Sequence, residues 1–215
     1  MNVLKRLNKK IKDICAKPHR KRICAIMRNR LINKDVSIIS SNCIGGILSH
    51  DLNIQFNSPT VNLFFSAEDF IKFATNLERY VGLTPVLDAK ESKEKGYVVA
   101  ALDDIHLYGV HYHDIEELQN SWKRRSERIN WNNLFFIMTD RNGMNEGDLV
   151  AFSKLPYPKV LFSSKQYPQY DFVVYINDFK NESQVGQLHF YADYKGNRYY
   201  EKYFDMVGWL NNETL

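Results

Sequence analysis

Apolar stretches with two different periods alternate along most of the chain. Residues 36–40 and 134–138 are short runs, rich in β-branched and aromatic side chains, with two apolar faces, which is typical of strands covered on both sides. Residues 67–81 and 114–128 instead repeat apolar side chains about every 3.6 positions, which predicts helices. This alternation predicts a three-layer α/β/α domain built on a largely parallel, mixed sheet.

The same pattern predicts most of the other elements. Ser66 is expected to be the N-cap of the helix 67–81, because acidic residues and the apolar stripe follow it, and Gly82 is expected to end that helix. A further helix is expected at 146–154, and residues 199–210 carry one apolar face. Short connections between the last strands predict an antiparallel extension at one edge of the sheet. Further strands are expected within 56–65, at the start of 86–96, and at 97–102, 159–162, 172–176 and 187–191.

Charge separates the N-terminal segment from the rest. Residues 1–35 have a net charge of +10, whereas residues 36–215 have a net charge of −6. We therefore expect a basic helical arm, 1–35, attached to a single α/β domain, 36–215.

Two helices are expected in this arm, separated at Pro18. The first has its apolar residues at Leu4, Leu7, Ile11 and Ile14, and the second at Ile23, Met27 and Leu31. The simplest interpretation is that both pack on the acidic body. The alternative is peripheral association with an anionic membrane. No nucleic-acid partner is expected, because the chain contains no RNA- or DNA-binding signature.

Cysteine content and hydropathy bear on the cellular location. The cysteines, Cys15, Cys24 and Cys43, are odd in number and form no CxxC pair, so neither a disulfide framework nor a zinc knuckle is indicated. No run of about 18 apolar residues and no secretory leader is apparent. We expect a cytoplasmic protein, with the inner face of the membrane as its place if the arm binds lipid.

A polar turn with two glycines follows the first strand and marks the first candidate site. Ser41, Asn42, Gly45 and Gly46 are candidate ligand-binding residues, because glycines permit close approach and helix N-termini attract anions. Cys43 is a candidate nucleophile at the same helix start. The turn matches neither a dinucleotide fingerprint nor a phosphate loop, and the competing interpretation is a tight strand-to-helix corner with a packed cysteine.

Two other loops supply candidate chemistry. Asp103, Asp104 and His106 follow a strand and offer acid–base groups or ligands for a divalent metal, although adjacent acids after a strand often only cap a turn. Asp140 and Arg141 follow the strand 134–138: Asp140 is a candidate base, and Arg141 either pairs with it or clamps a phosphate or carboxylate. We assign no metal site, and the sequence specifies no cofactor.

These loops would meet at one place if the strands were parallel, because ligands of open α/β sheets bind beyond the carboxyl ends of the strands. The loops concerned are 41–46, 103–106, 139–143 and 163–165. A site at this common edge is the principal functional prediction.

Several of these segments together resemble a known family. They are the SxNCxGG run over 40–46, SPTVNLFF at 58–65, DFIKFATNLERY at 69–80 and NLFFIMTDRNG at 133–143. The combination, which covers about 20–165, looks like the bacterial family called domain of unknown function 1919. The resemblance implies an α/β fold and supplies no catalytic residues. Members are often labelled exopolysaccharide or capsular polysaccharide biosynthesis proteins.

The function hypothesis combines the loops with that label. It is an enzyme of surface-polysaccharide assembly that transfers a sugar or acyl group from a cytosolic activated donor, with the donor's phosphates at the glycine turn and Arg141. The alternatives are a non-catalytic ligand-binding or scaffold protein, and an acyl transferase or hydrolase that depends on Cys43.

Overall fold

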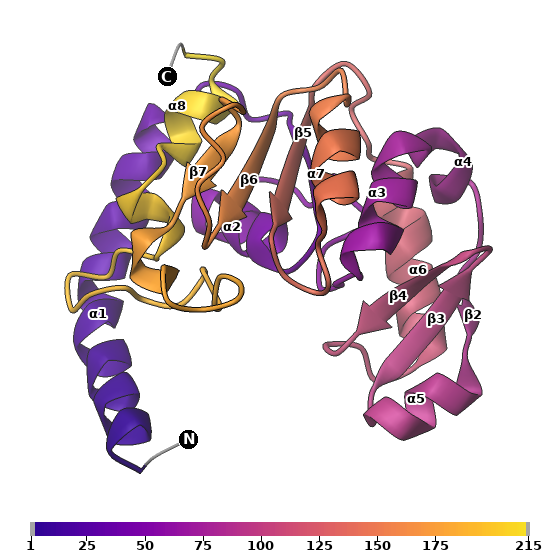
Figure 1. Ribbon diagram of the computed structural model, residues 1–215, viewed down its shortest axis with the longest axis horizontal. Coiled ribbons are helices and arrows are strands. Elements are labelled where there is room, and N and C mark those ends of the chain that lie inside the picture. Colours follow the sequence, from indigo (N-terminus) through magenta and orange to yellow (C-terminus); the bar gives the residue numbers. More distant parts are fainter. Residues whose placement is uncertain (1–2, 214–215) are drawn as a thin grey trace.

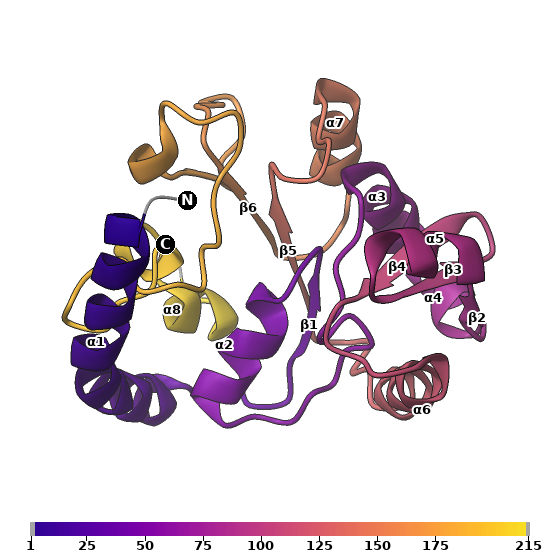
Figure 2. The same cartoon turned by 90° about the horizontal axis from the view of Figure 1, so that it is seen from below.

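The computed structural model describes residues 3–213, with side chains described from residue 10 onward. Its main sheet is parallel throughout, in the strand order β1-β5-β6-β7. Helices cover both faces of this sheet (Figures 1 and 2), so the fold is α/β, as the alternation predicted. The strands are β1 (Ser37–Ser40), β5 (Leu134–Thr139), β6 (Lys159–Ser163) and β7 (Val173–Tyr175).

Alternate residues of the central strands enter two separate cores. Phe135 and Ile137 of β5 pack under α1 (Val3–Arg30), α2 (Ile44–Leu52) and α8 (Met206–Leu210). Phe136 and Met138 pack on the other face, against α3 (Ala67–Thr75) and α7 (Glu146–Ser153). Every residue of β5 is buried, which explains why its sequence shows no polar face.

A second sheet lies between β1 and β5 in the sequence. It is antiparallel, in the order β2-β3-β4, and shares the second core with the helices around it. The predicted strand 97–102 exists, but it belongs to this small sheet and not to the parallel one. The elements are α4 (Leu77–Val81), β2 (Val86–Leu87), α5 (Ala89–Lys95), β3 (Val98–Leu102), β4 (Ile105–Gly109) and α6 (Ile115–Ser126).

The N-terminal arm contains one continuous helix, Val3–Arg30, instead of two. Pro18 lies inside α1 on its exposed side. The buried residues described for α1 follow a stripe through Ala16, Arg20, Cys24 and Met27, which continues to Leu31 just after the helix. This stripe packs α1 against α2 and the C-terminal segment.

The apolar stripe predicted for the first helix does not pack on the body where it is described. The side chains of Ile11 and Ile14 are 44% and 61% exposed. Those of Leu4 and Leu7 lie outside the described side chains. Within residues 3–213 no helix combines the length and apolarity that crossing a bilayer requires.

Elsewhere the structure differs from the pattern in several places. The helix predicted at 67–81 is interrupted at Asn76, and the charged turn after β2 is the helix α5. β7 pairs parallel to β6, so the expected antiparallel extension is wrong. Neither 56–65 nor 187–191 forms a strand; each contributes a single bridge, at Phe64 and at Tyr191. The C-terminal segment has 3₁₀ turns at Asn177–Phe179 and Tyr200–Lys202 before α8.

Candidate functional site

A cavity of about 430 Å³ lies beyond the carboxyl ends of β1 and β5. Its other walls come from the segment before α3, from the end of β4 and from the C-terminal segment. It is therefore at the edge where ligands of open α/β sheets bind. The lining residues are Asn42, Cys43, Asn62, Leu63, Phe64, Tyr108, Val110, His111, Arg141, Asn142, Gln187, His189 and Phe190.

The polar turn after β1 contributes two of its predicted residues to this cavity. Asn42 ties the two central loops together: its amide nitrogen donates to Thr139 Oγ1 at 3.0 Å, and its oxygen accepts from the backbone N–H of Ile44 at 3.1 Å. Cys43 lines the cavity beside it. Ser41 does not line the cavity; it is buried, and its backbone continues the sheet by donating to Ile137 O at 2.9 Å.

The paired glycines have a packing role. They lie in the first turn of α2 with right-handed helical geometry, and they do not line the cavity. A Cβ atom on Gly45 would lie 2.8 Å from Ser40 Cβ, and one on Gly46 would lie 3.0 Å from Val61 Cγ1. Glycine is therefore needed so that α2 can approach β1, which is the strand-to-helix corner considered as the alternative interpretation.

Arg141 is the principal charged group of the cavity. Its Nη1 donates to Gly186 O at 3.5 Å, its Nε has no hydrogen-bond partner, and within the described part of the chain it makes no ion pair shorter than 4.0 Å. Burial lowers the pKa of the guanidinium, although the charge of Asp140 opposes this change. A half-buried guanidinium without a paired carboxylate has the chemistry to bind an anion.

Asp140, the neighbour of Arg141, has a different role. Its Oδ2 accepts from Ser164 N at 2.7 Å and from the hydroxyls of Ser163 and Ser164, and its Oδ1 accepts from Val185 N at 2.7 Å. The carboxylate thus joins the end of β6 to the C-terminal segment. It is buried and does not line the cavity, so the structure does not bring its carboxylate to the candidate site.

The environment of Cys43 disfavours a thiolate. Burial raises the pKa of the thiol, and the nearby Arg141 charge only partly opposes this effect. A thiol with a raised pKa stays protonated near neutral pH and is a poor nucleophile.

The predicted loop 103–106 is not at the common edge. Asp103 and Asp104 form the two-residue turn between β3 and β4, with Asp103 in the left-handed region at φ 59°. Asp103 pairs with Arg79, and Asp104 accepts from the Tyr80 hydroxyl at 2.7 Å. The assumption behind their placement, that β3 is a strand of the parallel sheet, was wrong.

The side chain of His106 does not point into the cavity either. It lies on β4, where its imidazole faces Asp88 and Glu91 instead of the cavity. The three loops that do approach one another follow β1, β5 and β6, since Asp140 links the last two.

Several cavity residues were missed by the sequence analysis. Phe64 stacks on Tyr108 with ring centroids 4.7 Å apart, and His111 follows the end of β4. Asn62 and Asn142 both have left-handed backbones, at φ 67° and 60°. Asparagine is enriched in that conformation, so these two residues were the available signal that the chain turns sharply at the site.

Two comparisons with known proteins agree with one another. Residues 14–211 match the model of the family described as domain of unknown function (DUF1919). An uncharacterized protein of Haemophilus influenzae is 38% identical over 204 residues, which cover 94% of this chain and 97% of that protein. The chain belongs to the domain of unknown function 1919 family.

Proposed function

We propose that the cavity binds a small molecule carrying a phosphate or carboxylate group, with Arg141 as the anion anchor. The observation behind this proposal is the absence of an ion-pair partner within 4.0 Å of this half-buried guanidinium, among the residues described, at the edge of a ligand-sized cavity. Ligand pockets typically combine mostly apolar walls with a few polar groups that fix orientation. Here Leu63, Phe64 and Val110 supply apolar wall, and Asn42 and Asn142 supply amides.

The wider proposal is that this ligand is the activated donor of a sugar or acyl group in surface-polysaccharide assembly. A phosphate-bearing donor fits the anion anchor, and the stacked pair Phe64–Tyr108 offers an aromatic surface to a ring. Transfer would need a base in the cavity. Asp103, Asp104 and Asp140 do not line it, whereas His111 and His189 do, and this proposal assigns the role to His111.

The second part of the proposal is that the protein associates peripherally with the cytoplasmic face of the membrane. Its support is the exposure of Ile11 and Ile14 on a strongly basic helix. Ile11→Asp with Ile14→Asp should abolish co-sedimentation with anionic liposomes, whereas replacement of the exposed Ile32 by Asp should not. Equal pelleting of both variants and the unmodified protein would exclude this surface.

The binding proposal is tested by thermal shift and calorimetry on the full-length protein. The probes are inorganic phosphate, nucleoside diphosphate sugars and acyl-CoA, each with and without Mg²⁺. A ligand at about 100-fold above its Kd adds roughly 2.7 kcal/mol of stability, which is readily measured. We expect at least one probe to stabilise the protein.

Substitutions then test whether the ligand binds at Arg141. Arg141→Ala should weaken binding by about 10–100-fold, because a hydrogen bond to a charged group contributes about 1.5–3 kcal/mol. Arg141→Lys should be intermediate, since it keeps the charge but loses the two-pronged geometry. Arg124→Ala, on the exposed side of α6, is the matched control and should bind as the unmodified protein does. Equal affinity of the Arg141→Ala and Arg124→Ala variants would show that the anion site is elsewhere.

The same ligand distinguishes binding from transfer. If His111→Ala retains affinity and abolishes turnover, the protein is a transferase. If no probe is turned over by the unmodified protein while binding persists, the non-catalytic interpretation holds.

A further inference from the structure

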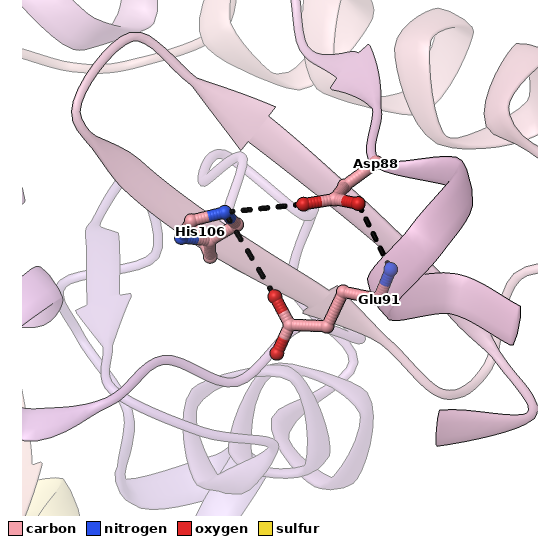
Figure 3. A group of neighbouring side chains, drawn as sticks. All are labelled: Asp88, Glu91 and His106. Carbon is pink, nitrogen blue, oxygen red and sulfur yellow. Dashed lines mark hydrogen bonds and ion pairs between the residues drawn. The ribbon is translucent and has the colours of Figure 1, made fainter. Parts of the chain in front are cut away.

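A compact group of three metal-binding side chains lies on the small antiparallel sheet, apart from the cavity lining. His106 Nε2 is 3.5 Å from Asp88 Oδ2 and 3.8 Å from Glu91 Oε2, and one ligand atom of each residue lies within 4.8 Å of the other two. Figure 3 shows the imidazole and both carboxylates pointing toward one another. All three side chains are half-buried, so the group is open to solvent on one side.

The fold brings these residues together through the strand register. Ala101 of β3 pairs with Val86 of β2 on one side and with His106 of β4 on the other. Asp88, which directly follows β2, is therefore near His106. Along β4 the residues Ile105 and Leu107 face the core, so His106 faces outward, on the side where the first turn of α5 lies.

The oxygen atoms that do not face His106 are occupied by protein donors. Asp88 is the N-cap of α5, and its Oδ1 accepts from Glu91 N at 2.9 Å. Glu91 Oε1 accepts from the Tyr108 hydroxyl at 3.2 Å. Each carboxylate is thus oriented by a bond to one oxygen, while its other oxygen points toward the histidine. Such outer bonds are typical of metal ligands, whose orientation they fix.

We propose that Asp88, Glu91 and His106 bind a divalent transition metal of the zinc class. Imidazole together with carboxylate is a ligand set that suits Zn²⁺, and three protein ligands leave one position for water or another ligand. Zinc–ligand bonds of about 2.0–2.2 Å place tetrahedral ligand atoms roughly 3.3–3.6 Å apart. The separation of 3.5 Å already falls in this range and that of 3.8 Å exceeds it by a few tenths of an ångström. The two carboxylate ligand atoms lie within 4.8 Å of each other, so rotation of the Asp88 and Glu91 side chains would complete the approach.

The site is adjacent to the cavity without belonging to it. Tyr108 connects them, because its ring lines the cavity while its hydroxyl holds Glu91. The metal proposal does not depend on Arg141 or on any anionic ligand.

The test is Zn²⁺ titration by calorimetry, with Co²⁺ absorption as a spectroscopic readout, on the full-length protein. We expect one equivalent of metal per chain. Asp88→Asn is the most informative variant, because asparagine is also a good N-cap but is a much weaker metal ligand. It should weaken Zn²⁺ binding at least about tenfold while leaving the unfolding temperature of the metal-free protein unchanged.

Four further variants guard against misinterpretation. His106→Ala should weaken binding at least as much as Asp88→Asn does, whereas His113→Ala, at an exposed histidine after β4, should leave it unchanged. Arg141→Ala should also bind Zn²⁺ normally, which separates this site from the anion site. Tyr108→Phe should weaken Zn²⁺ binding about tenfold, since Tyr108 only positions Glu91.

Several outcomes would overturn the proposal. They are the absence of Zn²⁺ binding, equal affinity of the Asp88→Asn and His113→Ala variants, and Co²⁺ bands characteristic of thiolate ligation. The absence of Zn²⁺ binding would mean that Asp88, Glu91 and His106 only link α5 to the β3–β4 hairpin. The last would place the metal on a cysteine.

Discussion

Arg20 is buried and Arg141 is half-buried, and their guanidinium groups have opposite surroundings. Arg20, on α1, donates to Asp51 Oδ2 at 2.6 Å and to Glu201 Oε2 at 2.7 Å, and Arg198 donates to the same Asp51 oxygen at 2.7 Å. Arg141 has only a carbonyl contact, at 3.5 Å. In both guanidinium groups the Nε atom lacks a partner, so the difference lies in the Nη atoms.

The pKa values of the two residues change in opposite directions. Burial alone would lower the pKa of Arg20, but the hydrogen bond and charge of Glu201, together with Asp51, raise it overall. Burial lowers the pKa of Arg141, and no bound carboxylate compensates. The comparison teaches that burial alone does not make an arginine a candidate ligand-binding residue. Its guanidinium group must also lack a carboxylate partner. Arg20 links α1 to the body, whereas Arg141 has hydrogen-bonding capacity that no carboxylate of the described residues uses.

The same substitution at the two positions is the strongest test of this contrast. Arg20→Met should lower the free energy of unfolding by about 3–5 kcal/mol, because it leaves Glu201 without its cation and Asp51 with one instead of two. Arg141→Met should change it by less than about 1 kcal/mol, or increase it, because it removes an uncompensated buried charge. Urea denaturation of the two ligand-free variants measures both values. Equal losses would mean that Arg141 is also structural.

Acidic pH should lower the stability that the ion pairs of Asp51 with Arg20 and Arg198 contribute. Burial would raise the pKa of Asp51, but the hydrogen bond and charge of Arg198, with those of Arg20, outweigh this effect and lower it. A carboxylate whose pKa is lower in the folded protein contributes stability above its unfolded pKa of about 3.9, and this contribution disappears as the pH falls through the folded value.

The control for this prediction is Asp51→Asn, which cannot titrate. The difference in unfolding free energy between this variant and the unmodified protein should be constant from pH 6 to about pH 5 and should shrink as the pH falls below about 4. A difference that is independent of pH down to pH 2.5 would contradict the role given to Asp51.

Local patterns predicted those parts of the fold that depend on neighbouring residues. Ser66 is the N-cap of α3, with its hydroxyl accepting from Asp69 N at 3.0 Å, as the sequence indicated. The hairpin β3–β4 was missed although β4 alternates between buried and half-exposed residues. Its turn, Asp103-Asp104, carries no glycine, and the two acids suggested chemistry instead. Which sheet a strand joins is decided by long-range pairing, which single-sequence periodicity does not contain.

The candidate site was predictable to the same extent. Asn42, Cys43 and Arg141 follow β1 and β5, and the rule for open sheets placed them correctly at one edge. The walls made by Tyr108 and His111 depend on how the small sheet packs beside the large one. The partners of His106 were unpredictable for the same reason, because Asp88 and Glu91 approach it only through the register of β2, β3 and β4.

Helix α2 connects the two arginine environments, since Cys43 is at its start and Asp51 is in its last turn. Gly45→Ala places a Cβ atom 2.8 Å from Ser40 Cβ and 3.1 Å from Ile38 Cγ2, so α2 must move away from β1. We expect a loss of about 1–2 kcal/mol, because overpacking costs about 1–3 kcal/mol and alanine regains up to about 1 through helix propensity.

The matched control is Gly82→Ala, where the nearest atoms are 3.6 Å or more away and φ is −77°. Thermal unfolding should show that this variant is as stable as the unmodified protein or slightly more stable. If Gly45→Ala is equally harmless, then the glycine at the start of α2 is not required for packing.

The smallest effect is expected at an arginine–carboxylate ion pair that is exposed to solvent. Arg79 and Asp103 form an ion pair whose side chains are 55% and 48% exposed, and exposed pairs contribute at most about 1 kcal/mol. Asp103→Asn should change the free energy of unfolding by about 0.5 kcal/mol or less, because asparagine also tolerates the left-handed turn conformation. It should leave binding of the anionic ligand unchanged, as measured by calorimetry beside Arg141→Ala. A loss of ligand affinity or turnover in Asp103→Asn would return this acid to the candidate site. It would also show that pairing with an arginine does not by itself mark a residue as structural.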